Sequence, residues 1–296
     1  MTTTADPYVT RHPGTSMRIP RSHPTVWGST PGPIAEADLA AYDRDGYLVL
    51  KDLLSDEEVN RYREELRRLN TDEDVRSDDR VVLEPDSEDI RSVFEAHLIS
   101  PVFGELLRSR RLVSIARQVL GSDVYIHQSR VNFKPAFGGA EFDWHSDFET
   151  WHAEDGMPVP RAFSMSIALT ENHPHNGPLM VIPGSHNTFV SCVGETPPNY
   201  HETSLRVHRL PIGSADRESL TDLANTHGIR QITGRAGSAV MFDCNILHGS
   251  NGNITPHPRS NIFVVFNSIE NTLKEPYAAL NRRPSHLASH DFSPIR

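Results

Sequence analysis

Residues 142–156 of this chain read FDWHSDFETWHAEDG, and the prediction of the fold starts from this stretch. His145 and Asp147 stand two positions apart, so on an extended strand their side chains would leave the same face and could bind one metal ion together. A third ligand must come from elsewhere, and His248 lies at the end of a later predicted strand. Two histidines and one carboxylate form the facial triad of non-haem Fe(II) oxygenases, which leaves coordination positions open.

A motif this short often occurs by chance, so the residues around His248 have to support it. Arg259 follows His248 after a turn, and Asn261 begins the next predicted strand. A hairpin of these two strands would bring the guanidinium of Arg259 close to the metal, where it could bind a carboxylate through two hydrogen bonds. A dicarboxylate co-substrate requires such a cation, whereas a zinc or storage site does not.

The hydrophobic pattern around this site changes from helical to strand-like near Gly121. Helices are predicted over 34–45, after a capping box of Ser55 and Glu58, and in a block from Ser100 to Gly121. Strands are predicted from Val124 onward and over 163–169, 179–182, 238–242 and 262–266, with a helical insertion at 211–229. Such an order predicts a mainly β fold with flanking helices, a sandwich or barrel of the jelly-roll type.

The organisation and composition of the chain restrict its function further. Residues 34–296 are predicted to form a single domain, with a helical layer over about 34–121 and core strands from about 122, preceded by an arm, 1–33, that lies over the domain or is partly disordered. The net charge of −10 and the absence of a basic stripe argue against nucleic acid or a membrane as partner. No apolar run is long enough for a membrane helix, and Cys192 and Cys244 are too few for a disulfide framework, so a cytoplasmic location is expected.

Three runs of sequence resemble a known family. Residues 142–156, 128–134 (QSRVNFK) and 245–251 (NILHGSN) are similar to the phytanoyl-CoA dioxygenase-like branch of the Fe(II)/2-oxoglutarate-dependent dioxygenases, and within it to the ectoine hydroxylases. The resemblance extends from about Gly46 to the C-terminus and implies a double-stranded β-helix core, which is the cupin-like jelly roll. It also implies hydroxylation of ectoine to 5-hydroxyectoine, with release of succinate and CO2, in compatible-solute biosynthesis under stress.

The resemblance assigns roles to individual residues. Fe(II) would be held by His145, Asp147 and His248, and the carboxylate of Asp147 indicates hydroxylation, because related halogenases have a small residue there to admit halide. Contacts to 2-oxoglutarate are assigned to Lys134, Arg259, Asn132 and Ser250. Contacts to ectoine, a small zwitterion, are assigned to two aromatic side chains and three polar ones: Trp151, Phe242, Gln128, Thr150 and Arg283. O2 would be the second co-substrate, and a homodimer is compatible with the family.

Two alternatives stay open at this stage. The chain could be a dioxygenase of the same branch that acts on another small amino-acid-like metabolite, although an acyl-CoA is disfavoured by the lack of a basic cluster. It could also be a non-catalytic jelly-roll module that binds a metal or a ligand. The remaining histidines near these motifs are expected at the surface, among them His152, which on a strand would point away from Trp151, and His186 in a Pro-Gly-Ser-His turn.

Overall fold

The computed structural model describes residues 6–84, 87–206 and 212–296. The strands in these ranges are β1 (Arg18–Pro20), β2 (Tyr47–Leu50), β3 (Val81–Leu83), β4 (Ile90–Phe94), β5 (Val124–Lys134), β6 (Phe142–His145), β7 (Ala162–Ala168), β8 (Leu179–Val181), β9 (Thr188–Val190), β10 (Arg230–Gln231), β11 (Ala239–Asp243), β12 (His248–Ser250) and β13 (Arg259–Ser268). The α-helices are α1 (Glu36–Asp45), α2 (Asp56–Thr71), α3 (Glu73–Arg76), α4 (Ala96–Ile99), α5 (Pro101–Leu107), α6 (Arg110–Leu120), α7 (Asp147–Thr150), α8 (Tyr200–Ser204) and α9 (Arg217–His227). A π-helical turn, η1 (Trp151–Asp155), and two 3-10 turns, η2 (Ser185–Asn187) and η3 (Ile269–Asn271), complete them.

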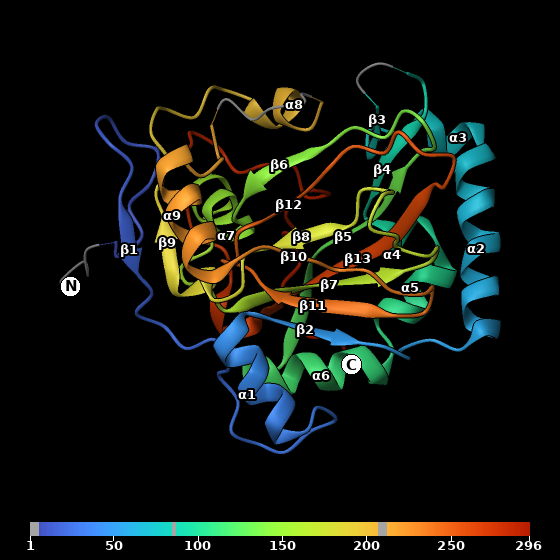
Figure 1. The fold of residues 1–296 in the computed structure, drawn as a ribbon, viewed down its shortest axis with the longest axis horizontal. Helices are drawn as coiled ribbons and strands as arrows, with labels where there is room; N and C mark the ends of the chain where they lie inside the picture. The colour runs from blue at the N-terminus through green and yellow to red at the C-terminus, as the bar shows by residue number, and fades with distance from the viewer. Residues whose placement is uncertain (1–5, 85–86, 207–211) are drawn as a thin grey trace.

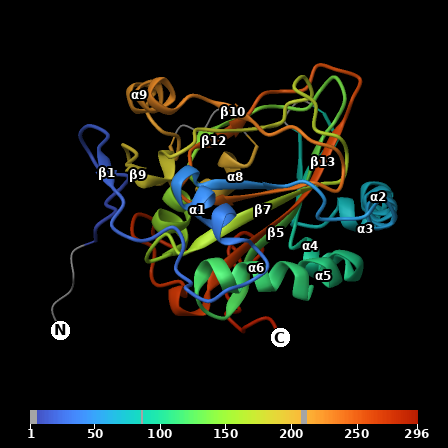
Figure 2. The ribbon, with the colours of Figure 1, turned by 60° about the horizontal axis from the view of Figure 1, so that its bottom comes forward.

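Two antiparallel sheets face each other across the middle of the molecule (Figure 1). The larger has seven strands in the order β2-β11-β7-β13-β5-β4-β3, and the smaller has four in the order β10-β8-β12-β6. Helices α2, α5 and α6 contribute side chains to the apolar core on the outer face of the larger sheet, and Figure 2 shows α5 and α6 beneath β5 and β7, with β10 and β12 on the other side. The predicted jelly-roll architecture with flanking helices is confirmed.

Alternation along the strands explains why the larger sheet can be covered on both faces. On β11, Met241 belongs to the core shared with the helices, whereas Val240 and Phe242 pack with Leu179 and Val181 of the smaller sheet. On β7 the side chains that alternate with the three apolar residues of the helix-facing core, Phe163, Met165 and Ile167, are serines, Ser164 and Ser166, which turn toward the interior of the sandwich. The strands therefore present polar groups to the space between the sheets.

The local predictions are largely confirmed. Ser55 and Glu58 form the reciprocal capping box that starts α2. The helical block from Ser100 to Gly121 consists of α5 and α6, and the helical insertion corresponds to α9, although residues 207–211 lie outside the described ranges. No described helix is both long and apolar enough to cross a bilayer.

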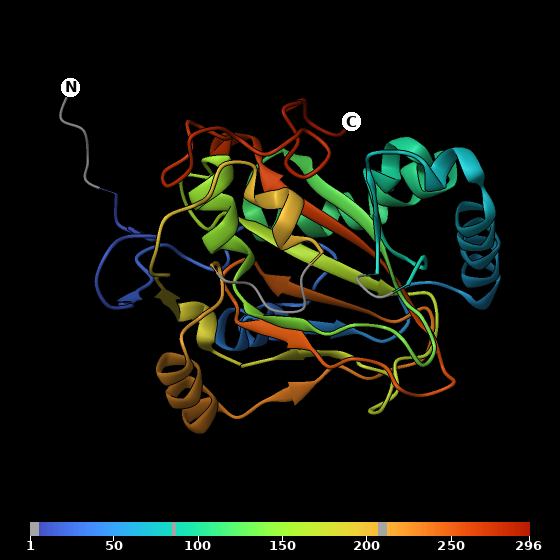
Figure 3. The same cartoon turned by 90° about the horizontal axis from the view of Figure 1, so that it is seen from above.

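The described part of the N-terminal arm, residues 6–33, lies against the domain. Tyr8, Thr10, Arg11 and Thr25 are buried, and β1 pairs with β9. In Figures 1 and 3 this arm, drawn in blue, lies at the end of the molecule opposite α2. The arm covers the outside of the segment that follows β6.

Candidate metal centre and active site

His145, Asp147 and His248 meet between the two sheets. β12 pairs with β6 so that His248 stands opposite His145, and their ring centroids are 4.2 Å apart. One carboxylate oxygen of Asp147, Oδ1, lies 3.6 Å from His145 Nε2 and 3.9 Å from His248 Nε2. The three ligand atoms all lie within 4.8 Å of one another, and no other group of this kind occurs among the described residues.

The expected continuous strand through Asp147 is wrong. β6 ends at His145, and Asp147 begins α7 after Ser146, whose hydroxyl accepts a hydrogen bond from the backbone N–H of Glu149. The following turn is the π-helix η1, which ends at Gly156. Gly156 has φ 79°, and a Cβ there would collide with the carbonyl of Lys274, so only glycine fits this end of the segment. Capping by Ser146 thus overrides the strand-like spacing of the motif.

The hydrogen bonds of the two histidines leave the correct nitrogen free for a metal. His145 Nδ1 lies 2.7 Å from the carbonyl of Asp143, and His248 Nδ1 lies 3.1 Å from the carbonyl of Ile246. A carbonyl can only accept, so Nδ1 carries the proton in each ring and Nε2 presents its lone pair. The donor set, two neutral imidazoles and one carboxylate with an open side, fits Fe(II).

The ionisation of these ligands suits metal binding. Burial, and to a lesser extent the neighbouring imidazole of His145, lowers the pKa of His248 to about 4. Burial raises the pKa of Asp147, but His248 and His145 outweigh it, so this pKa lies below its usual value. The other carboxylate oxygen, Oδ2, accepts a hydrogen bond from Ser164 at 3.1 Å, which fixes the orientation of the group. Neutral imidazoles and an ionised carboxylate are the forms that ligate a metal.

A small cavity opens beside His145 and His248, on the side of β5 and β13. Three of the four residues predicted to contact a co-substrate line it: Asn132, Ser250 and Arg259. Arg259 is 5% exposed, and burial lowers its pKa to about 10. Among the described residues no carboxylate forms an ion pair with it, and its Nε has no hydrogen-bond partner. A buried cation without a counter-ion indicates a site for an anion.

Lys134, the fourth predicted contact, lies behind Ser250 rather than in the cavity wall. It stands opposite Arg259 across the β5–β13 pair. Its Nζ donates to Ser250 Oγ at 3.1 Å and to the carbonyls of Ala140 and Asn251 at 2.8 and 2.7 Å. Burial and the charge of Arg259 lower the pKa of Lys134 to about 6. It therefore reaches the cavity through the hydroxyl of Ser250.

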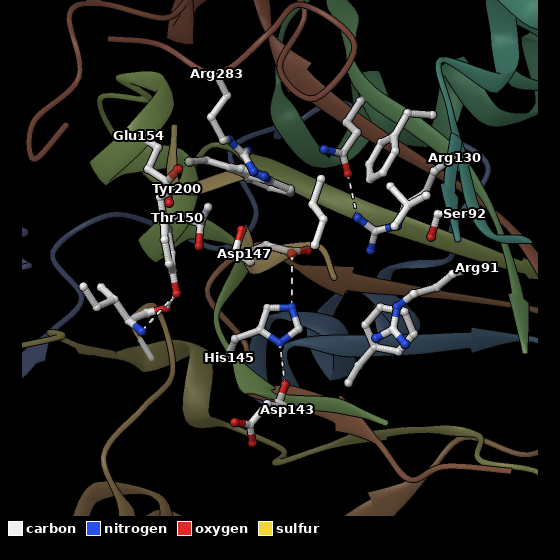
Figure 4. A pocket seen from close by; sticks show the side chains of 18 of the residues that line it. Arg91, Ser92, Arg130, Asp143, His145, Asp147, Thr150, Glu154, Tyr200 and Arg283 are labelled. Atoms are coloured by element: carbon white, nitrogen blue, oxygen red, sulfur yellow. Dashed lines mark hydrogen bonds and ion pairs between the residues drawn. The ribbon is translucent and has the colours of Figure 1, made fainter. Parts of the chain in front are cut away.

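A larger cavity also adjoins the triad, and it shares Arg130, Phe142 and His145 with the smaller one (Figure 4). His145 and Asp147 lie in its wall together with four of the residues predicted to contact substrate: Gln128, Thr150, Trp151 and Arg283. Arg283 donates through Nε and Nη2 to both oxygens of Asp155, at 2.8 and 2.6 Å. Gln128 donates to the carbonyl of Leu287 and accepts from Arg130. The structure thus brings these four side chains to the metal ligands.

Phe242, the fifth residue predicted to contact substrate, lies beside His248 but outside both cavities. Its side chain belongs to the apolar cluster between the sheets, with its ring centroid 5.0 Å from that of His248, and it lines neither of the two cavities described above. The alternation of β11 turns it toward Leu179 and Val181 of the facing sheet. Phe242 therefore packs against the metal ligand His248, and its contact with substrate stays a prediction.

The prediction of a surface position is wrong for two histidines. His152 and His186 are both fully buried. His152 lies in η1, where its Nδ1 bonds to the carbonyl of Met157 and its ring stacks on Tyr277. The strand assumed for this segment put His152 on the wrong face, because the chain is helical here.

Arg130 is the main site residue that the sequence analysis overlooked. It lines both cavities, and its guanidinium lies 5.0 Å above the ring of Phe263. The signal was present, because Gln128, Arg130, Asn132 and Lys134 alternate along one face of β5. Asp155, which holds Arg283, carried no such signal, because its partner is far away in the sequence.

Comparisons with known proteins agree with this geometry. The model of the phytanoyl-CoA dioxygenase (PhyH) family matches residues 42–261. An ectoine dioxygenase from Streptomyces avermitilis is 54% identical over the whole of both chains, and one from Halomonas elongata is 48% identical over 96% of this chain and 86% of its own.

A solved structure of EctD from S. alaskensis with 2-oxoglutarate and 5-hydroxyectoine has a TM-score of 0.88 and 46% identity, covering 98% of this chain and 96% of that one. Another structure of that enzyme, with bound Fe, has the same TM-score. The carbocyclase SnoK, at 20% identity and a TM-score of 0.60, covers 82% of this chain and 88% of its own, and it shares the fold.

Proposed function

The chain belongs to the phytanoyl-CoA dioxygenase family, and from this premise we propose that it hydroxylates ectoine to 5-hydroxyectoine. Fe(II) is the metal, 2-oxoglutarate and O2 are the co-substrates, and succinate and CO2 are released. The observation that carries the proposal is the larger cavity, in which Gln128, Thr150, Trp151 and Arg283 share one wall with His145 and Asp147. Relatives about half identical over their whole length, named ectoine dioxygenases, support the choice of substrate.

His145, Asp147 and His248 would hold the iron, which supplies the activation of O2 needed to hydroxylate an unreactive C–H bond. The Nδ1–H bonds to the carbonyls of Asp143 and Ile246 orient the two imidazoles. The bond from Ser164 does the same for Asp147. These residues therefore present three preset ligands to the ion.

We assign the smaller cavity to 2-oxoglutarate. Arg259 would bind its distal carboxylate, because it is a buried guanidinium with no carboxylate partner among the described residues. Ser250 and Asn132 would supply hydrogen bonds, with Ser250 held by Lys134 from behind. A dianion placed there would compensate the charge of both cations.

The larger cavity suits a small zwitterion. Arg283 offers a cation for the carboxylate of ectoine, and the ring of Trp151 offers an aromatic face for its amidinium. Trp151 is held edge-on by His127, with ring centroids 5.0 Å apart. The two cavities meet at the metal ligands, so a substrate carbon and the co-substrate can both reach the ion.

The experiment that tests this proposal incubates the purified protein with Fe(II), ascorbate, 2-oxoglutarate, O2 and ectoine, and follows succinate and the mass of ectoine. We expect one succinate for each ectoine that gains one oxygen. Succinate without that gain would retain the iron chemistry and discard ectoine in favour of another small amino-acid-like metabolite. Neither product from an iron-loaded sample would favour the non-catalytic binding module.

Two further assignments belong to the proposal. We propose a cytoplasmic location, supported by the two cysteines being free thiols. We also propose a homodimer, in line with the family, which light scattering on the purified protein would test.

A further inference from the structure

The wall of the larger cavity that follows β6 is one helical segment with two faces. α7 and η1 join without a break from Asp147 to Asp155. Asp147, Thr150, Trp151 and Glu154 line the cavity, and their spacing of three and four residues is that of a single helical face. The position of this segment therefore decides the shape and charge of the cavity.

The N-terminal arm holds the opposite face of the same segment. The ring of Tyr8 packs edge-on against Phe148, with centroids 5.1 Å apart. Asp6 accepts a hydrogen bond from His152 Nε2 at 3.1 Å. Each contact joins residues that are more than a hundred positions apart, so the arm acts on the cavity wall from outside.

Arg11 is the centre of this contact. Its Nε and Nη2 both donate to Glu149, at 3.0 Å each, and its Nη1 donates to Glu154 at 2.7 Å. The side chains of Arg11, Glu149 and Glu154 are 0, 1 and 5% exposed. Arg11 has φ 52°, a left-handed backbone conformation that is unfavourable for a residue with a Cβ. The chain thus accepts backbone strain at the residue that holds Glu154.

Glu154 is close to Arg283 but is not paired with it. Both side chains line the cavity and are drawn near each other in Figure 4. Arg283 uses Nε and Nη2 on Asp155, and its Nη1 donates to no acceptor among the described residues. Oε1 of Glu154 instead accepts a hydrogen bond from Nη1 of Arg11. One nitrogen of Arg283 is therefore left for a ligand, while Arg11 engages the neighbouring carboxylate of Glu154.

We propose that Arg11 is a positioning residue for substrate binding: it holds Glu154 away from Arg283, so that the guanidinium remains available to the carboxylate of the substrate. Without Arg11, Glu154 would lose its buried counter-ion, and the free side of Arg283 in the same cavity would be a cation that it could pair with. The two groups would then pair inside the cavity and compete with the substrate anion. This inference rests on the proposed function for the identity of that substrate.

The test compares R11M with a matched variant, R21M. Arg21 belongs to the same arm and forms an equally buried ion pair, with Asp243 at 2.7 Å and side chains 2 and 1% exposed, but its hydrogen bonds go to His23, Pro24, Pro160 and Asp243 and to no described residue of α7 or η1. We expect R11M to raise the KM for ectoine about tenfold or more while the KM for 2-oxoglutarate changes less than about twofold. R21M should leave both KM values within about threefold of the original enzyme.

A second substitution separates positioning from a loss of stability. In the double variant R11M/E154Q the competing carboxylate is gone, so the KM for ectoine should return most of the way, whereas R11M/E149Q should stay impaired. Equal recovery in both double variants, or in neither, would overturn the proposal. If R11M does not fold, R11K supplies the same comparison, because its single ammonium cannot hold both glutamates as the guanidinium does.

A crystal structure of R11M decides the geometry without reference to activity. We expect the carboxylate of Glu154 within 4 Å of the guanidinium of Arg283, the distance that defines an ion pair. Glu154 remaining in its original place would refute the proposal even if ectoine binding is weakened. An original enzyme that does not turn over ectoine would contradict the proposed function alone, since the position of Glu154 in R11M is still measured.

Discussion

The two cavities that meet at the metal ligands differ in how their cations are balanced. In the smaller cavity Arg259 has no carboxylate partner among the described residues, and Lys134 behind it donates only to neutral oxygens. In the larger one Arg283 is paired with Asp155 and Arg91 with Glu84, and only Arg130, which lines both cavities, lacks an ion pair among the described residues. Unbalanced positive charge suits a dianion such as 2-oxoglutarate, and balanced charge suits a zwitterion such as ectoine. The charge balance, more than the shape, distinguishes the two binding sites.

The largest effect should come from removing one of the three metal ligands at which the two cavities meet. We expect D147A to lose ectoine hydroxylation by about a thousandfold or more, which corresponds to about 4 kcal/mol. The reason is that two histidines alone do not complete the facial set of ligands. Hydroxylation and iron content measured on the same sample check this prediction, and circular dichroism serves as the control for folding. Retained turnover with a normal iron content would refute the ligand assignment.

Arg283, the cation paired with Asp155, should matter for the stability of the fold as well as for substrate binding. We expect R283M to lower the free energy of unfolding by about 3–5 kcal/mol, because it leaves the fully buried Asp155 without its partner. The double variant R283M/D155N should recover most of that loss without recovering the KM for ectoine. Urea unfolding and steady-state kinetics on both variants measure the two quantities. If R283M is as stable as the original, the pair does not balance the charge of this cavity.

Arg259, the cation without a carboxylate partner among the described residues, should matter for binding but not for the stability of the fold. R259M should raise the KM for 2-oxoglutarate by roughly tenfold to a hundredfold, the equivalent of about 1.5–3 kcal/mol for charge-assisted hydrogen bonds. It should leave the ligand-free protein as stable as before or more so, since it removes a buried charge that has no counter-ion. Titration with 2-oxoglutarate tests the expected loss of affinity, and unfolding of the iron-free protein tests the expected stability. A large loss of stability would mean that Arg259 has a structural partner and would remove the contrast with Arg283.

The difference between the cavities also shows what the sequence could predict. Residues of the smaller cavity lie on long strands, and the alternation of β5 and β13 places Asn132, Lys134 and Arg259 together without further information. The same rule would have found Arg130. The jelly-roll fold was predictable for this reason, because period-two patterns and turn residues identify the strands.

The wall of the larger cavity could not be predicted in the same way. Its helical segment was taken for a strand, because the capping of α7 by Ser146 and the π-turn of η1 are decided by a few local hydrogen bonds. The pairs Arg283–Asp155 and Arg11–Glu154 join residues far apart in the sequence, and no periodicity connects them. The sequence also does not show that the side chain of Phe242 turns toward Leu179 and Val181 of the facing sheet.

The smallest effect concerns the pH dependence of the unbalanced cavity. Burial and Arg259 lower the pKa of Lys134 to about 6 from 10.5, so between these values the folded ligand-free protein binds fewer protons than the unfolded chain. Because of Lys134, the free energy of unfolding of the ligand-free protein therefore increases as pH rises through that window. The slope corresponds to a difference of at most one bound proton between the unfolded and the folded chain. Binding of the 2-oxoglutarate dianion favours the charged ammonium, so it should take up a proton, and affinity should fall as pH rises above about 6.

The measurement is the affinity for 2-oxoglutarate, under anaerobic conditions, from pH 6.5 to 8.5. In K134M the slope attributable to Lys134 should disappear, while the affinity at pH 6.5 drops only a few-fold, because Lys134 acts through Ser250. An unchanged slope in K134M would assign the pH dependence to another group. A drop in affinity as large as that of R259M would show instead that Lys134 contacts the co-substrate directly, and the charge of the smaller cavity would then be shared equally between the two cations.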